Sequence, residues 1–279
     1  MDYGVVLTGV GPMADPEKLR RAARKADQLG FRSLWLFEHT AFPTQISEDY
    51  GKIPFSHEMS FLEPLTTLAY LAAETTQIRL GTGILLLALR HPLQVAKAIS
   101  TLDVFSGGRA MLGVGLGWLA EEFQALGIPF GQRVGRVSES VEVLRKIWAS
   151  GKLRHEGRYY SFAEVTSYPL PVQPGGPPIW FGGFAEPALK RAVELGDGWL
   201  GTGGRLDKVC RKISMVRQHA QESGKEGFQI AVGANPEISR EDVDQLRQAG
   251  ASQINLSFPS GEASEIENSM EAAARRLFA

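Results

Sequence analysis

The sequence contains one cysteine and no long hydrophobic run. A lone Cys210 cannot form a disulfide within the chain. Because it shares an apolar helical stripe with Leu206, Val209 and Ile213, we expect a buried structural thiol. The longest apolar run, 84–89, is far too short to cross a bilayer, and the first residues lack the basic segment of a signal peptide. These absences predict a protein of the reducing cytoplasm that does not enter a membrane.

An excess of charge of one sign is also missing, since 30 basic and 31 acidic residues leave a net charge of -1. This balance gives no support for nucleic acid or an anionic membrane surface as a partner. His57, His155 and His219 have no metal-ligand spacing with one another or with carboxylates, so we expect no metal site. The sequence has no nucleophile elbow, P-loop lysine or cysteine-histidine pair. We therefore expect the chemistry to come from a bound cofactor.

What the sequence does contain is a regular alternation of β-rich apolar runs with amphipathic helical segments. Eight strands and about eight helices, in a chain of 279 residues, predict a closed (β/α)₈ TIM barrel that forms one domain over residues 1–279. The expected strands are 4–8, 33–37, 78–84, 110–114, 179–181, 199–201, 228–233 and 253–258. The expected helices are 16–29, 61–75, 92–106, 136–150, 187–195, 206–222, 240–249 and 266–278, with a partly helical segment at 119–129.

Two long segments depart from this alternation. Residues 40–60 follow the second strand without any period, and a structureless loop of this length in a compact domain is usually functional, so we predict a lid. Residues 152–177 are rich in proline, glycine and aromatics and form a predicted insertion after the fourth helix, lying over one end of the domain. The connections from helix to strand are short, whereas several strand exits are long or glycine-rich. The working surface is therefore expected at the carboxyl ends of the strands.

Ionisable side chains stand at the end of the second strand. Glu38 could hydrogen-bond a cofactor, and His39 could carry a proton or contact a substrate. The alternative, a hydrogen-bonded pair that only closes the barrel mouth, stays open from the sequence. His91, directly before Pro92, is expected to be a structural or capping residue.

Glycines cluster after the strands, where a backbone without side chains lets a flat or phosphorylated ligand come close. The run from Gly113 to Trp118 resembles half of a dinucleotide fingerprint. However, no helix starts cleanly at its end and no acidic residue follows at the required distance. Gly182 and Gly183, between a strand and a helix, are a better phosphate cradle because backbone N–H groups and a helix N-terminus meet there.

The order of several motifs resembles the bacterial luciferase-like superfamily of flavin- or deazaflavin-dependent oxidoreductases. The resemblance covers roughly residues 4–201 and is strongest to the short, single-barrel branch that is generally assigned to coenzyme F-420. The motifs are LGFRSLWLFEH, then LGTGILLLALRHPLQVAKAISTLDVFSGGRAMLGVGLGWLAEEFQALG, then PPIWFGG and ALKRAVELGDGW.

The resemblance implies that the exit of the second strand meets the cofactor. Glu38 and His39 stand where the family usually has Asp-His, beside the edge of the flavin or deazaflavin ring. A glutamate carries its carboxylate one methylene further out than an aspartate. Glu38 is thus implied in catalysis and cofactor binding, and His39 is the implied proton partner.

The other implied cofactor-binding residues lie at other strand exits. Gly83 and Ile84 match the site where many family members carry a non-proline cis peptide that backs the ring. Gly182 and Gly183 would hold the cofactor phosphate. Some deazaflavin sugar-phosphate dehydrogenases place an acid at the position of Trp118, so a sugar phosphate is not the expected substrate. The fourth strand exit would flank the ring and ribityl chain through Gly115, Gly117, Trp118 and Glu121.

The implied function is an oxidoreductase that passes hydride between coenzyme F-420 and a small organic substrate. An FMN-dependent monooxygenase that uses O₂ is the alternative within the superfamily, and a non-catalytic flavin-binding protein is a second alternative. Residues 40–60 and 152–177 would supply the substrate walls. Family members are commonly dimers, so a homodimer is expected, with the apolar stretch 85–89 as a candidate contact.

Overall fold

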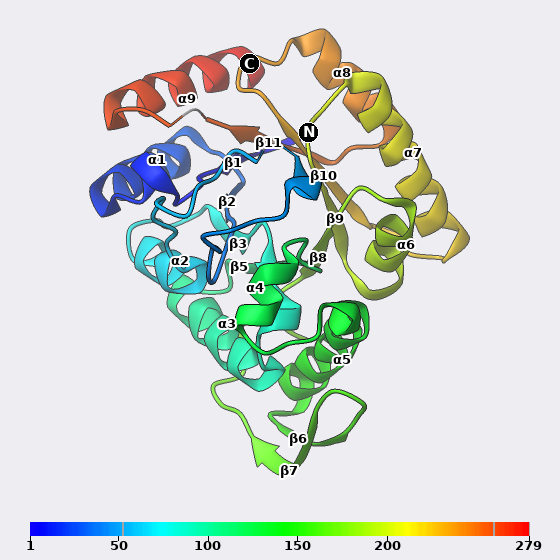
Figure 1. Ribbon diagram of the computed structural model, residues 1–279. Coiled ribbons are helices and arrows are strands. Elements are labelled where there is room, and N and C mark those ends of the chain that lie inside the picture. The colour runs from blue at the N-terminus through cyan, green and yellow to red at the C-terminus, as the bar shows by residue number, and fades with distance from the viewer. Residues whose placement is uncertain (52, 259, 279) are drawn as a thin grey trace.

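The computed structural model describes residues 1–51, 53–258 and 260–278. Across these residues, eight parallel strands close into a ring, with helices on its outside (Figure 1). The last strand pairs with the first, which closes the barrel and confirms the predicted TIM barrel. Around the ring the strands are β1 (Asp2–Val6), β2 (Ser33–Leu36), β3 (Arg79–Thr82), β5 (Ala110–Gly115), β8 (Ile179–Gly182), β9 (Gly198–Gly201), β10 (Gln229–Ala234) and β11 (Gln253–Ser257).

The outer helices alternate with the strands, as the apolar periodicity predicts. A short helix, α4 (Ala120–Ala125), lies instead over the barrel mouth, in front of β5 and β8 in Figure 1. The outer helices are α1 (Pro16–Leu29), α2 (Pro64–Ala72), α3 (Pro92–Ser106), α5 (Arg133–Ser150), α6 (Glu186–Leu195), α7 (Leu206–Glu222), α8 (Arg240–Ala249) and α9 (Ala263–Leu277).

The helix ends follow from local chemistry. Asp15 accepts a hydrogen bond from the Lys18 backbone N–H at 2.8 Å and begins α1, while Gly30 ends it with φ at 85°. At the start of α3, the His91 side chain accepts from the Leu93 N–H at 3.3 Å. The prediction that His91 is a capping residue is therefore confirmed.

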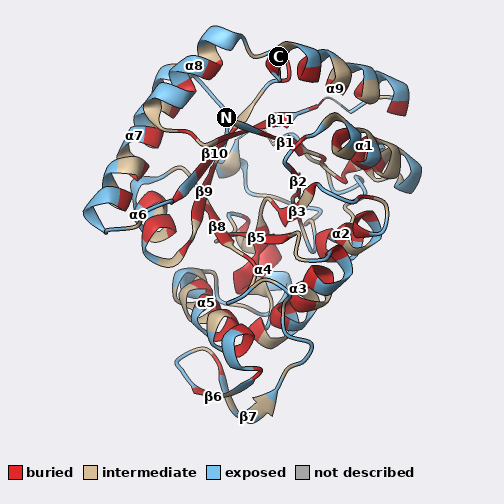
Figure 2. Ribbon diagram, turned by 180° about the vertical axis from the view of Figure 1, so that it is seen from behind, coloured by how far each residue is buried: buried red, intermediate tan, exposed pale blue. Residues whose placement is uncertain are grey.

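The core has two layers, one between the ring and the helices and one inside the ring. Figure 2 shows the buried residues on the strands and on the helix faces turned toward them. Inside the ring, the rings of Trp35 and Trp180 meet at 5.7 Å between centroids. The inner layer is made of Trp35, Met111, Trp180, Leu200 and Ala231. The inside of the barrel is thus packed with side chains below its mouth.

The insertion forms an antiparallel hairpin of β6 (Lys152–Glu156) and β7 (Ser161–Thr166), which lies outside the ring at the bottom of Figure 1. The hairpin packs on α5, where the Ser140 hydroxyl donates to the Tyr160 phenol oxygen at 3.2 Å. Further along, Gln173 donates from its backbone N–H to Asp103, near the end of α3. The insertion therefore packs on α3, on α5 and on the amino end of β5, where Gln173 Nε2 donates to the Ala110 carbonyl.

Two sequence-based expectations need correction. The stretch 85–89 is not a dimer contact, because β4 (Leu85–Leu86) pairs with the end of β5 and the side chains of 85–88 are buried in the core. Cys210 packs against the core as expected but is only half-buried. Within the described ranges, no helix has the length and apolar character that crossing a membrane requires.

Candidate active site

A pocket of about 270 Å³ opens at the carboxyl ends of the strands, and we call it the mouth pocket. Its walls come from seven different strands or the segments directly after them, which is where ligands of such barrels bind. Four of the predicted cofactor-binding residues, Gly83, Ile84, Gly182 and Gly183, line it. The other lining residues are Val6, Trp35, Leu200, Gly201, Thr202, Gly203, Gly233, Asn255 and Ser257.

The peptide bond between Gly83 and Ile84 is cis, as the resemblance implies. The Ile84 side chain lies across the ends of β5 and β8. A Cβ on Gly115 would sit 2.0 Å from Ile84 Cδ1, and a Cβ on Gly182 would sit 2.7 Å from Ile84 Cγ2. Gly115 and Gly182 therefore leave room for the Ile84 side chain, and Gly182 also lines the mouth pocket.

Glu38 is buried and bound within the protein. Its carboxylate accepts from the Leu86 backbone N–H at 3.0 Å and from Arg90 Nη2 at 2.7 Å. Burial raises the pKa of Glu38, while the Arg90 charge and the two hydrogen bonds act in the opposite direction. Arg90 also donates to Glu63 at 2.9 Å. Glu38 thus ties the segment after the cis bond to the barrel, and it is not among the residues that line the mouth pocket in the described chain.

His39 is held by a carboxylate that sequence reasoning did not select. Its Nδ1 lies 3.0 Å from Glu122 Oε2, and the other oxygen of Glu122 accepts from the backbone N–H groups of Thr40 and Ala41. The side chains of His39 and Glu122 are 5% and 1% exposed. With Nδ1 beside the carboxylate, the remaining ring nitrogen, Nε2, is the atom on which His39 can exchange a proton.

Aromatic rings enclose this pair. The centroids of four rings lie 5.1 to 5.9 Å from the His39 ring and come from the 40–60 segment, its continuation and the exit of β5. Rings at these distances exclude water, which strengthens the interaction between the imidazole and the carboxylate. The four rings belong to Phe42, Phe55, Phe61 and Trp118.

Trp118 and Glu121 hold the 40–60 segment. Glu121 accepts from the Ser47 N–H at 3.2 Å and from the Tyr50 hydroxyl at 3.3 Å, and the ring of Tyr50 meets Trp118 at 5.1 Å. Gly117, with φ at 80°, packs under Phe123. Trp118 and Glu121 therefore contact the predicted lid, and among the described residues neither they nor Gly117 line the mouth pocket.

The turn between β8 and α6 has the features of a phosphate cradle. Gly183 has φ at 118°, and a Cβ there would sit 2.8 Å from the Ala188 Cβ, so the position has no room for a side chain. Trp199 Nε1 donates to the Gly183 carbonyl at 2.7 Å and holds the turn in place. Backbone N–H groups at the start of α6 can donate hydrogen bonds to an anion there. Among the described residues, no group of three or more His, Cys, Asp or Glu side chains could hold a metal ion.

A family model described as luciferase-like monooxygenase matches residues 1–278. The chain belongs to this family. The sequence-based identification of a luciferase-like oxidoreductase is thereby confirmed. Among its relatives is a protein of Kineococcus radiotolerans named F420-dependent glucose-6-phosphate dehydrogenase. The two are 31% identical over 221 residues, covering 77% of this chain and 61% of the relative.

Solved structures share the luciferase-like fold over the whole chain. A coenzyme F420-dependent tetrahydromethanopterin reductase from Methanopyrus kandleri superposes with a TM-score of 0.81 at 19% identity, covering 99% of this chain and 98% of the other. A monooxygenase from Streptomyces bottropensis superposes with a TM-score of 0.80 at 24% identity, covering 100% and 99%. At these identities the likeness establishes the barrel.

In this luciferase-like barrel the predicted site residues fall into separate groups. Gly83, Ile84, Gly182 and Gly183 line the mouth pocket. His39, Trp118 and Glu121 gather under the 40–60 segment. Glu38, Gly115 and Gly117 support these groups from within the protein. Glu122 was missed, although its position beside Phe123 on the buried face of α4 is a usable signal.

Proposed function

We propose that this luciferase-like protein is an oxidoreductase that binds coenzyme F-420 at the barrel mouth and passes hydride between the deazaflavin and a small organic substrate. The observation that carries the proposal is the shielded His39–Glu122 pair at the same end of the barrel as the mouth pocket. The name of the Kineococcus relative supports F-420 as the cofactor. When bound, the cofactor supplies the hydride acceptor or donor.

The chain's own residues have distinct tasks in this reaction. Ile84 and the Gly83 backbone form the wall against which the cofactor ring is placed, and the Gly182–Gly183 turn offers N–H groups to the phosphate. His39 exchanges a proton with the substrate at Nε2 while Glu122 holds Nδ1. The lid over 40–60 and its aromatic rings keep water from this exchange.

We assign the substrate walls to the 40–60 segment. The insertion was expected to contribute a wall, but it packs outside the ring on α3 and α5. Position 118 carries a tryptophan where some sugar-phosphate dehydrogenases of the superfamily carry an acid, which disfavours a sugar phosphate as the substrate. The aromatic rings around His39 and Trp118 favour an apolar or planar compound. The substrate we propose is therefore small, organic and unphosphorylated.

Titration of the purified protein with F-420 and with FMN tests the cofactor. We expect F-420 to bind at least tenfold more tightly, and a preference for FMN would favour the monooxygenase alternative, which the family description also supports. Reduced F-420 is then mixed with a panel of aldehydes, ketones and activated alkenes. Substrate-dependent oxidation that is lost in His39→Ala supports the proposal, whereas no oxidation with any compound favours a non-catalytic flavin-binding protein.

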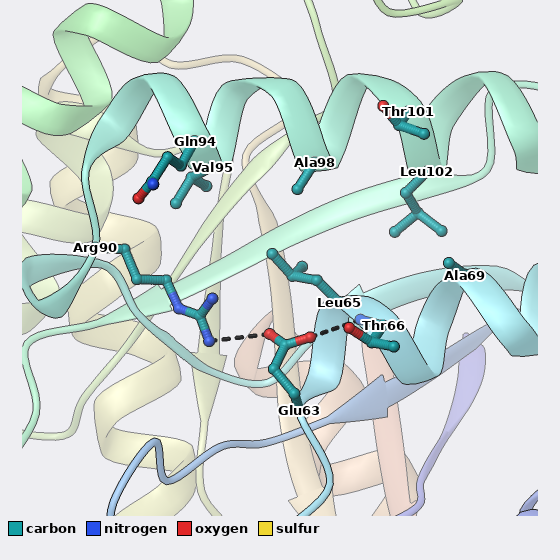
Figure 3. Close-up of a pocket in the computed structure, with 10 residues that line it drawn as sticks. All are labelled: Glu63, Leu65, Thr66, Ala69, Arg90, Gln94, Val95, Ala98, Thr101 and Leu102. Carbon is teal, nitrogen blue, oxygen red and sulfur yellow. Dashed lines mark hydrogen bonds and ion pairs between the residues drawn. The ribbon is translucent and has the colours of Figure 1, made fainter.

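We also propose that the protein is a homodimer. A groove of about 530 Å³ runs between α2 and α3 on the outside of the barrel, with Arg90 and Glu63 at one end and apolar side chains along its length (Figure 3). Phe105 continues the same stripe of α3 and is 67% exposed. An exposed aromatic beside an apolar groove is typical of a protein interface.

A cytoplasmic location stays a prediction.

A further inference from the structure

A polar cluster lies inside the barrel, in a layer that apolar side chains normally fill. Trp35 Nε1 donates to Ser33 Oγ at 2.8 Å, and Gln253 Nε2 donates to the same oxygen at 2.8 Å. Gln253 Nε2 also donates to Asn255 Oδ1 at 2.6 Å. Ser33, Gln253 and Asn255 are all buried. The four side chains thus form one connected chain of hydrogen bonds from β2 to β11.

The hydrogen bonds inside the barrel show how Asn255 is oriented. An indole N–H only donates, so Ser33 Oγ is the acceptor for Trp35. Gln253 uses both hydrogens of its amide nitrogen, one toward Ser33 and one toward Asn255. In the structure, Asn255 presents its oxygen to Gln253, so its Nδ2 points the other way. In the described chain, this Nδ2 donates to no protein atom.

The space on the other side of Asn255 is the mouth pocket. Asn255 lines this pocket while being only 6% exposed. An amide N–H group that faces a pocket can donate a hydrogen bond to a ligand that carries an acceptor atom. Asn255 therefore offers its Nδ2 as a hydrogen-bond donor to a ligand in the mouth pocket.

Gly4 makes the cluster possible. It lies on β1, in register with Asn255 on β11 and with Ser33 on β2. A Cβ on Gly4 would sit 2.3 Å from Asn255 Oδ1 and 2.4 Å from Ser33 Oγ. A side chain at position 4 would push apart the polar side chains of Ser33 on β2 and Asn255 on β11. An apolar layer would pack the barrel at least as well, so stability alone does not explain the cluster.

We propose that Asn255 is a cofactor-binding residue whose Nδ2 donates a hydrogen bond to an acceptor atom of the cofactor in the mouth pocket. Ser33, Gln253 and Gly4 act as positioning residues that hold the amide in this orientation. The inference rests on the proposed function in taking the mouth pocket as the cofactor site. It holds for F-420 and for FMN alike, because both rings carry carbonyl oxygens.

The test is a fluorescence titration of each variant with F-420 and with FMN. Asn255→Asp replaces the donor by an acceptor of the same shape, and we expect the dissociation constant to rise at least thirtyfold. Asn255→Ala removes the donor without adding charge, and we expect a rise of about tenfold. Gly4 does not line the pocket, but Gly4→Ala should weaken cofactor binding by a similar factor because it displaces Asn255. Asn268→Asp, on an exposed part of α9, is the matched control and should bind like wild type.

Thermal unfolding of each variant without cofactor separates a binding defect from a folding defect. Folded Asn255 variants that bind the cofactor within twofold of wild type would overturn this inference and leave the proposed function standing. If Asn255→Asp does not fold, the result for Asn255→Ala decides. Wild-type protein that binds neither cofactor would overturn the proposed function and this inference together.

Discussion

At the scale of single residues, the His39–Glu122 pair carries the most chemistry. Replacing Glu122 by Gln keeps the shape but removes the negative charge beside Nδ1, so His39 loses the partner that fixes its proton. We expect kcat/KM to fall about 10²-fold or more, with cofactor affinity unchanged within twofold. Steady-state kinetics over a range of pH, with cofactor titration, measure both quantities.

The neighbouring Glu121 provides the control. Glu121→Gln changes the same residue type on the same helix but contacts Ser47 and Tyr50 and not His39. Its kcat and pH profile should stay closer to wild type than those of Glu122→Gln. Equal losses in the two variants would contradict a special role for Glu122.

Glu38 and Arg90 give a prediction about stability and pH. Arg90→Met leaves a buried carboxylate without its cation, which we expect to cost about 3–5 kcal/mol of unfolding free energy near pH 7.5. Burial already raises the pKa of Glu38, and losing Arg90 raises it further. A carboxyl group with a raised pKa in the folded state stabilises the fold at low pH, and this contribution is lost as pH rises through that pKa.

The penalty of Arg90→Met should therefore be smaller at pH 5 than at pH 7.5, because lowering the pH favours the protonated form of Glu38, which carries no buried charge. Urea unfolding at the two pH values measures it. The double variant Glu38→Gln/Arg90→Met removes the buried charge and should recover part of the loss at pH 7.5. A penalty that does not change with pH, or a double variant that is no more stable than Arg90→Met, would speak against this account.

Residue partners were the part of the site that the sequence predicted least well. The sequence placed His39 and Glu38 correctly at the end of a buried strand, since strand ends follow from local apolar patterns. Their partners are far along the chain, because Glu122 lies 83 positions from His39 and Arg90 lies 52 positions from Glu38. Local patterns carry no information about such pairings. The resemblance implied Glu121, and the sequence pointed to Glu122 merely through its place beside Phe123 on the buried face of α4.

At the scale of elements, the segment after β3 depends on the fit of Ile84 over the ends of β5 and β8. Gly115→Ala places a methyl group 2.0 Å from Ile84 Cδ1, and we expect a loss of about 1–3 kcal/mol in unfolding free energy. Ile84→Val removes that Cδ1 atom, so the double variant Gly115→Ala/Ile84→Val should be more stable than Gly115→Ala alone. Chemical denaturation measures all three proteins.

Gly131→Ala is the matched control, because a Cβ there meets no atom within 4 Å. We expect its stability to stay within about 0.5 kcal/mol of wild type. If Gly115→Ala is as stable as Gly131→Ala, then Ile84 does not pack as the structure indicates.

The barrel strands and the outer helices were predictable, whereas the small elements were not. Buried parallel strands give continuous apolar runs, and capping residues such as Asp15 and His91 mark the helix starts. The hairpin of β6 and β7 gives no such run, because most of its residues are exposed or half-buried. Residues 85–89, which include strand β4, were read as a candidate dimer contact because the pairing of β4 with β5 is not visible in the sequence.

At the scale of the whole molecule, the groove between α2 and α3 predicts how two copies associate. Phe105→Glu places a charge at the exposed end of that groove, so we expect the dimer to dissociate at micromolar concentration. Light scattering coupled to size-exclusion chromatography measures the mass. Val134→Glu, at a half-exposed valine on α5, should leave the mass unchanged. A wild-type monomer would refute the proposed homodimer.

The two adjacent glutamates on α4 limit how the substrate range of this protein can be altered by substitution. Glu121 hydrogen-bonds to the 40–60 segment and Glu122 to His39, and both glutamates belong to one helix of six residues. A substitution that loosens the segment to admit bulkier compounds also loosens the imidazole. Variants that accept a broader range of substrates should therefore have a lower turnover rate, unless a second substitution holds α4 in place.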